Sequence, residues 1–502
     1  MTRRRVLRCR FAGGADDVRI GCLVILVAGC PLLAGWVSGQ TPSGPTVYNE
    51  VRVALDRTAL SNLQKTVRSV LTGTAQLRGN EADIDRWYSH FFASMTQLDE
   101  SRTRLADTND LPAKRHMLHR DLRGAKNAEF HDYAVKRVLE IATKLVNPRA
   151  NFHPAVRYNA MLIVGDLNQH EALLVGSEAG PAEPLGAALD VMLEALDNPL
   201  HSDAVRVAAL IGILRHAELQ AMMPAARRWP EGTRDRVNER VLKLAAARQP
   251  PPGRSQAGHD WMRRRAVEIL SASASVGPGG SVARTLDEIV RDEQADLGLR
   301  CSAAAALGSM EYGQSAPFDP ARAVRGIGMV TVDICRAELD RLDAILDAEQ
   351  RDAEMAASTP SAPTDGLGAP PTRPAGGLIL GEPQPTISSA EADAADTSAA
   401  HVATARRQLL YQLGCVRRGL AGGREGAGLA ALATQPTARS TVEAVQSSLQ
   451  TLLAVLDQPG LTMDSLTQQL AQEALRLHEA LPADGDERPA DDAPPDDGPP
   501  LE

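Results

Sequence analysis

Apolar positions repeat with the period of an α-helix over most of this chain. Leu60, Leu63, Val67 and Val70 are spaced 3-4-3, and the same kind of stripe predicts a second helix over Glu81–Leu98. This spacing places apolar side chains on one face of a helix with 3.6 residues per turn. The two stripes are separated by glycine-containing stretches, which predicts a helical hairpin at the start of the patterned region.

Four segments of the middle region share one longer pattern. It reads apolar residue, arginine, two residues, alanine, apolar or small residue, two residues, apolar residue. The arginines are Arg157, Arg206, Arg263 and Arg300, and the alanines three positions later are Ala160, Ala209, Ala266 and Ala303. The arginines stand 49, 57 and 37 positions apart, so the period is irregular. The longer intervals contain insertions at Gly176–Pro184 and Gln249–Gly258.

Each of these segments follows another helical stripe, and turn residues lie between the two. Asn147-Pro148 and Asn198-Pro199 are the clearest turns, because proline prevents the preceding helix from continuing. The predicted unit is therefore helix, short turn, helix. A single helix pair cannot bury both of its faces, so we expect successive pairs to stack on a shared core.

The pattern resembles the HEAT-repeat family. Asp197-Asn198-Pro199 followed by Asp203-Ala204-Val205-Arg206 is the best match, and Asp296 with Leu299-Arg300 is the next. The resemblance covers residues 130–350 and implies an all-α fold, an α-solenoid of HEAT-like helix pairs. It also implies that the repeat arginines tie neighbouring repeats together through carboxylates and backbone carbonyls. Arg157 has no aspartate three or four residues before it, so its partner is not predicted.

Composition divides the rest of the chain. Residues 354–400 are rich in Pro, Ala, Gly, Ser and Thr and cannot bury enough apolar area to offset chain entropy, which predicts a disordered linker. The expected regions are an export signal or N-terminal membrane anchor (1–39), an N-terminal helical hairpin region (45–125), the HEAT-like solenoid (130–350), the linker (354–400), a C-terminal helical hairpin (401–481) and an acidic disordered tail (482–502).

The C-terminal hairpin is predicted from a further stripe. Val442, Val445, Leu449, Leu452 and Leu456 are spaced 3-4-3-4, and apolar residues continue at helical spacing after Pro459-Gly460. This is typical of an αα-hairpin or a short coiled-coil seam. Two heptads favour a hairpin that packs on itself or on the solenoid over a free coiled coil.

The first 39 residues have the order of an export signal. Six arginines lie within the first 19 residues, and residues 20–37 are uncharged and mostly apolar. Three interpretations stay open: cleavage after Gly39, lipidation of Cys30 in the lipobox-like run Leu26–Cys30, or an uncleaved membrane anchor. All three place the body outside the cytoplasm, in the periplasm or cell envelope of a bacterium.

Charge and composition limit the classes of partner. The formal net charge is −9, and the 8 acidic residues and single arginine of 484–502 account for −7 of it. The rest of the chain is close to neutral and lacks the basic field of a nucleic-acid-binding protein. An aromatic fraction of 3% with abundant Ala and Leu favours helices over β-sandwiches.

Candidate chemistry is sparse. Outside the leader, Cys301, Cys335 and Cys415 have no metal-ligand spacing and are interpreted as buried small apolar residues, although one disulfide stays open. His116 and His119 share a helix face, and His131 is the nearest third ligand for a metal. The run 263–265 makes a basic spot beside Trp261 that could hold an anion. None of these predicts a catalytic residue, a metal site or a cofactor.

Two functions are compatible with this pattern. In the first, the chain is a non-catalytic scaffold of the cell envelope whose concave solenoid face binds a protein partner, because repeats of this kind mainly serve as interaction surfaces. In the second, it is an enzyme or chaperone-type lyase on a HEAT scaffold, similar to some bilin lyases, that acts on a small-molecule ligand. The second would need a pocket with convergent polar groups.

Overall fold

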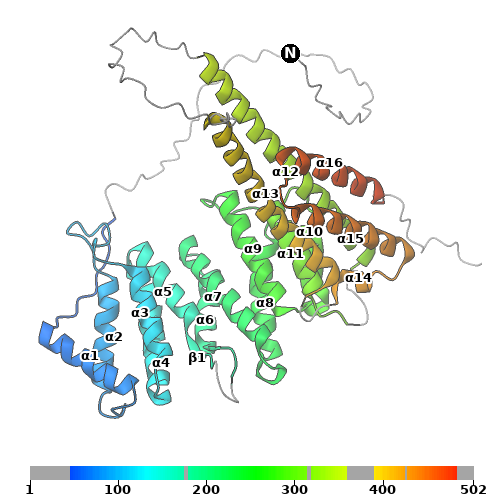
Figure 1. Ribbon diagram of the computed structural model, residues 1–502. Coiled ribbons are helices and arrows are strands. Elements are labelled where there is room, and N and C mark those ends of the chain that lie inside the picture. Colours follow the sequence, from blue (N-terminus) through cyan, green and yellow to red (C-terminus); the bar gives the residue numbers. More distant parts are fainter. Residues whose placement is uncertain (1–45, 174–178, 314–317, 359–388, 424–426, 483–502) are drawn as a thin grey trace, which may run out of the picture. The chain divides into compact units, whose positions relative to one another are not determined.

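The computed structural model describes residues 46–173, 179–313, 318–358, 389–423 and 427–482 (Figure 1). The prediction of an all-α fold is confirmed, since these residues are mostly helical. The described residues from Val47 onwards group into one compact unit. The leader, including Cys30, and the acidic tail from 483 onwards lie outside the described residues. No helix among the described residues is long and apolar enough to span a membrane.

The N-terminal region contains the two expected helices and a third. Two of these helices have capped N-termini. Asp56 accepts a hydrogen bond from the backbone N–H of Ala59, and Asp110 accepts one from the backbone N–H of Ala113. Helix α2 packs against α1 and α4, and α3 packs against α5. The bounds are α1 Arg57–Leu71, α2 Glu81–Met95 and α3 Leu111–Arg123.

The middle of the chain consists of helix pairs, each linked by a short turn. The pairs are α4 (Ala128–Val146) with α5 (Pro154–Asp166), α6 (Gly186–Asp197) with α7 (Asp203–Met222), α8 (Glu231–Ala246) with α9 (Gln256–Ser273), and α10 (Ser281–Arg291) with α11 (Leu297–Ser309). Short 3-10 turns η1 (Pro148–Ala150), η2 (Ala225–Arg227) and η3 (Pro278–Gly280) lie in the connections. A small antiparallel hairpin, β1 (Asn168–His170) and β2 (Glu183–Pro184), lies between α5 and α6.

The second helices of the pairs pack closely against one another. Helix α5 contacts α7, α7 contacts α9, α9 contacts α11, and α11 contacts α13 (Ser389–Ala421). We call these five helices row B, and α4, α6, α8, α10 and α12 (Pro320–Ser358) row A. Helix α12 packs on α10 and α13 as a further pair would. The pairing therefore continues through α12 and α13, beyond residue 350.

Glycines allow the close approach within row B. A Cβ on Gly165 of α5 would lie 2.7 Å from the Cα of Gly212 on α7, and one on Gly308 of α11 would lie 2.7 Å from the Cα of Gly419 on α13. Real Cβ atoms essentially never come this close to another backbone, so only glycine fits these crossings. Helix α11 is accordingly buried on almost every side from Leu299 to Leu307.

Row A is more open from α4 to α10, where grooves lie between neighbouring helices. Volumes of about 310, 460 and 690 Å³ lie between α4 and α6, α6 and α8, and α8 and α10. Helix α10 has one strongly apolar face, on which Val282, Leu286 and Val290 are buried, while Arg284 and Glu288 are exposed. From α4 to α10, row A thus buries fewer sides of its helices than row B does, whereas α12 is buried on almost every side from Ala323 to Cys335.

The C-terminal helices share the core of the repeats. Helices α15 (Pro436–Leu456) and α16 (Met463–Ala480) pack on each other and on α12 and α13, and the short α14 (Gly428–Leu432) contacts α11 and α13. The stripe from Val442 to Leu456 faces this core. Of the expected linker 354–400, residues up to Ser358 and from Ser389 are helical, and residues 359–388 lie outside the described part of the chain.

Candidate functional site

The four repeat arginines make one common contact. Each donates a hydrogen bond to a backbone carbonyl near the end of the row A helix of its own pair. The bonds are Arg157 Nε to Val146 O (3.3 Å), Arg206 Nη2 to Asn198 O (3.0 Å), Arg263 Nε to Ala245 O (3.0 Å) and Arg300 Nε to Val290 O (3.0 Å). Helix ends leave their last carbonyls without intrahelical partners, and a guanidinium also favours the negative end of the helix dipole.

Three of these arginines also contact side chains through their other nitrogen atoms. Arg206 pairs with Asp203 of its own helix (3.3 Å), which the local spacing had indicated. Arg300 pairs with Asp333 on α12 (2.9 Å), and Arg157 lies 3.3 Å from the ring nitrogen of His201 in the α6–α7 turn. Arg300 and Arg157 therefore join neighbouring pairs, and all three side chains are engaged by protein groups.

An ion pair between Arg254 and Asp203 connects the α8–α9 connection to the start of α7. Asp203, at the start of α7, accepts two hydrogen bonds from Arg254 in the α8–α9 connection, at 2.7 and 2.8 Å. The neighbouring Arg206 and Arg254 guanidinium groups hold the pKa of the Asp203 carboxyl below its usual value, Arg254 contributing most through its hydrogen bond. These contacts tie the α6–α7 turn to the α8–α9 connection.

The three arginines of the basic spot at 263–265 differ in burial, because Arg263 lies on the buried face of α9. Arg263 is 3% exposed and is bound to Ala245 O and Asp260. Arg264 and Arg265 both pair with Glu268, at 3.4 and 2.5 Å. The two outward arginines are thus partly neutralised, and an anion site at this place is disfavoured.

These half-buried arginines belong to a larger surface cluster that includes two exposed residues of α13. The guanidinium of Arg265 lies 5.0 Å from the ring centroid of Trp261, and Arg264 donates to Tyr411 Oη on α13 at 2.9 Å while stacking over its ring at 5.4 Å. We define the α9–α13 surface as Trp261, Arg264, Arg265, Glu268, Leu410 and Tyr411. Leu410 and Tyr411 are 39% and 45% exposed, which is unusual for large apolar side chains.

Electrostatics couple the α9–α13 surface to α7. Burial, followed by the nearby Glu268, raises the pKa of the Glu218 carboxyl on α7. Burial opposes the charged form of Arg264, but Tyr411 and Glu268 outweigh it, so the pKa of Arg264 is raised. Sequence reasoning found Trp261 and the arginines but missed Tyr411, because it lies 147 positions from Arg264 and only the packing of α13 brings it there.

The histidines considered for a metal site separate in the structure. His119 Nε2 lies 3.0 Å from an oxygen of Asp166, while His131 Nε2 lies 3.5 Å from an oxygen of Glu171. Burial works against the charge of Asp166, but His119 outweighs it and leaves the pKa of that carboxyl below its usual value. Within the described ranges, no three His, Cys, Asp or Glu side chains are placed to hold a metal ion.

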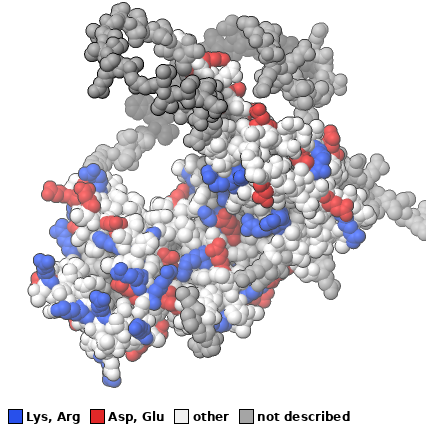
Figure 2. All heavy atoms as spheres, in the orientation of Figure 1, with Lys and Arg blue, Asp and Glu red and all other residues white. Residues whose placement is uncertain are grey.

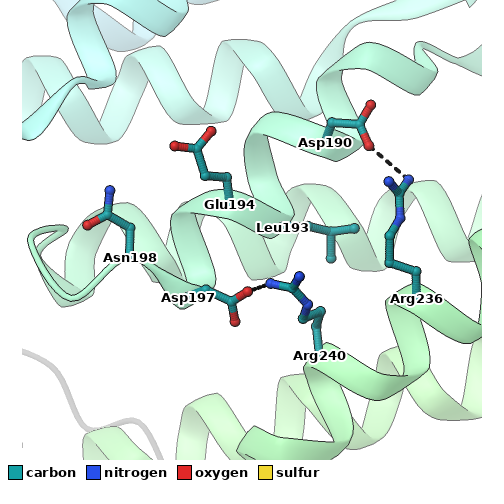
Figure 3. A pocket seen from close by; sticks show the side chains of 7 residues that line it. All are labelled: Asp190, Leu193, Glu194, Asp197, Asn198, Arg236 and Arg240. Atoms are coloured by element: carbon teal, nitrogen blue, oxygen red, sulfur yellow. Dashed lines mark ion pairs between the residues drawn. The ribbon is translucent and has the colours of Figure 1, made fainter.

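The groove between α6 and α8 is open and charged (Figure 3). Arg236 and Arg240 project from α8 towards α6, where Arg236 pairs with Asp190 at 2.8 Å and Arg240 pairs with Asp197. Its charges are therefore largely satisfied by one another. More broadly, Lys, Arg, Asp and Glu are interspersed over the face of the described surface drawn in Figure 2.

The cysteines outside the leader are free and buried, in agreement with their interpretation as small apolar residues. Cys301 and Cys335 have thiols whose pKa burial raises to about 12, so neither is a reactive thiolate. No family model, curated protein or solved structure matches this chain.

Proposed function

We propose that this chain is a non-catalytic protein-binding scaffold built on HEAT-like repeats arranged as an α-solenoid. Two features support the repeat assignment. The row B helices contact one another in chain order, and an arginine at the same repeat position bonds the end of the paired row A helix in all four pairs. Stacked pairs of this kind expose a long face and are mainly used for interaction.

The observation that carries the binding proposal is the composition of the α9–α13 surface. Trp, Tyr and Arg are the residues enriched where binding energy concentrates in protein interfaces. The chain has only 4 Trp and 6 Tyr, yet Trp261 and Tyr411 lie on this surface with two arginines held by Glu268. We place the protein partner on row B, across this surface.

The enzyme or lyase alternative gains no specific support from the grooves. An active site needs polar groups that converge on a ligand position. In the α6–α8 groove, Asp190 and Asp197 are instead engaged by Arg236 and Arg240 (Figure 3). This arrangement favours the scaffold.

Photocrosslinking in the full chain tests the scaffold. A benzophenone amino acid replaces Tyr411 in the producing cell, and Leu200, which is 59% exposed in the α6–α7 turn, serves as the control position. We expect one discrete crosslinked protein from position 411 and none from position 200. Crosslinks of equal yield and identity at both positions, or none at 411, would contradict the proposal.

We further propose that the scaffold belongs to the bacterial cell envelope. The support is the order of the leader, with arginines followed by the apolar residues 20–37. Membrane attachment would follow if the leader stays uncleaved or Cys30 is lipidated. A reporter enzyme that is active only outside the cytoplasm, fused after Ser43, should be active, and cytoplasmic activity of a matched reporter would contradict export.

A further inference from the structure

Cys301 and Cys415 lie on the facing sides of α11 and α13. On α11, Cys301 precedes Ala304 and Gly308 by three and seven positions, which places all three residues on one face of the helix. On α13, Cys415 precedes Gly419 by four positions, which again is the spacing of one face. Gly308 and Gly419 form the backbone crossing between the two helices, so both cysteines belong to the faces that meet there.

Contacts between α11 and α13 place the two cysteines at the same level. The Ser302 side chain interacts with the Tyr411 hydroxyl, and a Cβ on Gly419 would lie 2.7 Å from Ala304 O. Both contacts join the two helices in the same order of residues, so α11 and α13 run in the same direction. The cysteine of α13 lies midway between these contacts, opposite the turn of α11 that carries the other cysteine.

The two thiols are buried next to each other. Cys301 is 0% exposed and Cys415 is 1% exposed. Burial is the main cause that raises the pKa of the Cys301 thiol, and the neighbouring Cys415 adds to it. A disulfide needs Cα atoms that are about 4.4–6.8 Å apart. Backbone contact at the glycine crossing excludes the layer of side chains that normally separates two helices, so we expect facing residues one turn away to come within this range.

Cys335 has different surroundings. It is 1% exposed on α12, and its acidic neighbour is Glu473 of α16. Cys335 is therefore the natural reference for a buried thiol that stays reduced.

We infer that Cys301 and Cys415 form a disulfide that joins α11 to α13 when the chain folds in an oxidising compartment. The inference rests on the proposed cell-envelope location, because disulfides form and persist in oxidising compartments. The bond would hold Tyr411, which lies one turn before Cys415, next to Arg264. It would thereby stabilise the α9–α13 surface, whose two parts are distant in the sequence.

The oxidant in this step is another disulfide, carried by a small thiol compound or by a thiol oxidoreductase. One cysteine thiolate attacks a sulfur of the oxidant, which forms a mixed disulfide and releases one thiolate. The second cysteine thiolate then attacks the mixed disulfide and releases the other thiolate. The cysteine pair loses two electrons, and the oxidant becomes two thiols that take up the two protons. Because neither side chain is exposed in the folded chain, these exchanges precede the docking of α13 on α11.

Thiol mapping of the refolded full chain tests the pairing. The reduced, denatured chain is refolded with glutathione disulfide, unfolded again without reductant, alkylated with N-ethylmaleimide and digested for mass spectrometry. We expect the peptides of Cys301 and Cys415 to be joined and Cys335 to be alkylated. Alkylation of all three residues, or any other pairing of Cys301 or Cys415, would overturn the inference.

The same mapping on chain taken directly from the producing cell separates the inference from the proposed location. Thiols are trapped with N-ethylmaleimide at lysis. A joined pair in the cell supports both proposals. A pair that forms on refolding but is absent from the cell supports the inference and contradicts the cell-envelope location.

Alanine variants distinguish the bond from the packing of the thiols. Reduction should lower the thermal unfolding midpoint of the oxidised wild type by about 5 °C. Cys335→Ala is the matched control and should keep this sensitivity to reductant, whereas Cys301→Ala and Cys415→Ala should lose it. Equal midpoints of the oxidised and reduced wild type, or a reductant effect that persists in Cys415→Ala, would overturn the inference.

Discussion

The two rows of helices differ in how closely neighbouring helices pack. In row B, α5, α7, α9, α11 and α13 pack on one another in chain order, and glycines bring α5 close to α7 and α11 close to α13. In row A from α4 to α10, neighbours are separated by open grooves, and α6 and α8 are connected by exposed ion pairs. The comparison teaches that row B sets the stability of the stack, because close-packed interiors tolerate little change. The exposed ion pairs of row A can change at low energetic cost.

The largest effect is expected from charge placed in row B. Ala209 and Ala303 occupy the same repeat position and are completely buried. Ala209→Glu or Ala303→Glu would bury an unpaired carboxylate and cost on the order of 3 kcal/mol or more. Ala403→Glu, at an exposed position of α13, is the matched control and should be nearly neutral. If thermal unfolding shows equal midpoints for core and control variants, these alanines are not at helix contacts.

Two glycines test the close approach within row B with an identical substitution. A Cβ on Gly308 would meet the backbone of Gly419, whereas a Cβ on Gly414 of α13 would meet nothing within 4 Å. Gly308→Ala should lose about 2–3 kcal/mol of stability through overpacking. Gly414→Ala should gain up to about 1 kcal/mol, because glycine is unfavourable inside a helix. Urea titrations that rank the two variants in the reverse order would refute the glycine crossing.

Acid should weaken row B through His216, which is buried next to the α5–α7 crossing. Burial, aided by Arg215, lowers the pKa of His216 to about 3, so the ring is neutral in the folded protein at pH 5. The unfolded chain binds a proton below about pH 6.5, and folding stability therefore falls as the pH drops below that value. His216 alone accounts for a loss of about 2 kcal/mol between pH 8 and pH 5.

His216→Gln isolates this contribution. The variant has no proton to gain at this position, so its unfolding free energy should fall between pH 8 and pH 5 by about 2 kcal/mol less than that of the wild type. Chemical denaturation at the two pH values gives both differences. An identical pH dependence in variant and wild type would show that His216 titrates normally in the folded state.

The smallest effect is expected from the ion pairs of row A. The side chains of Arg236 and Arg240 are 47% and 35% exposed, and exposed pairs contribute about 0–1 kcal/mol. Arg236→Gln and Arg240→Gln should therefore each cost less than about 1 kcal/mol, and the loss should shrink further in 0.5 M salt. A loss as large as that of Gly308→Ala would erase the contrast between the rows.

The sequence predicted the local part of this structure and missed contacts between distant segments. The arginine–alanine pattern and the Asp203–Arg206 spacing were readable, because both follow from the period of one helix. Gly165 and Gly308 were visible as small residues, but their partners Gly212 and Gly419 depend on how helices cross. The partnership of Arg300 with Asp333 likewise depends on the packing of α12.

For the α9–α13 surface, too, the sequence indicated the local residues and missed the contacts between distant segments. Trp261 and the arginines beside it stood out in the sequence as a basic spot, but Glu268 and Tyr411, which hold the two outward arginines, were not recognised. The composition of 354–400 indicated a break between domains, whereas the structure packs α13 directly on α11. The composition of a segment indicates that it cannot form a core of its own, but it does not indicate where the following helices pack.

Because α13 packs directly on α11, row B includes α13 and the C-terminal helices belong to the stack. Cutting the chain tests it most directly. A specific protease site is inserted within residues 359–388, and the cut chain is examined under reducing conditions by size exclusion and thermal unfolding. The account predicts that the two fragments elute together and unfold in a single transition. Separate elution, with independent unfolding of a C-terminal fragment, would contradict it.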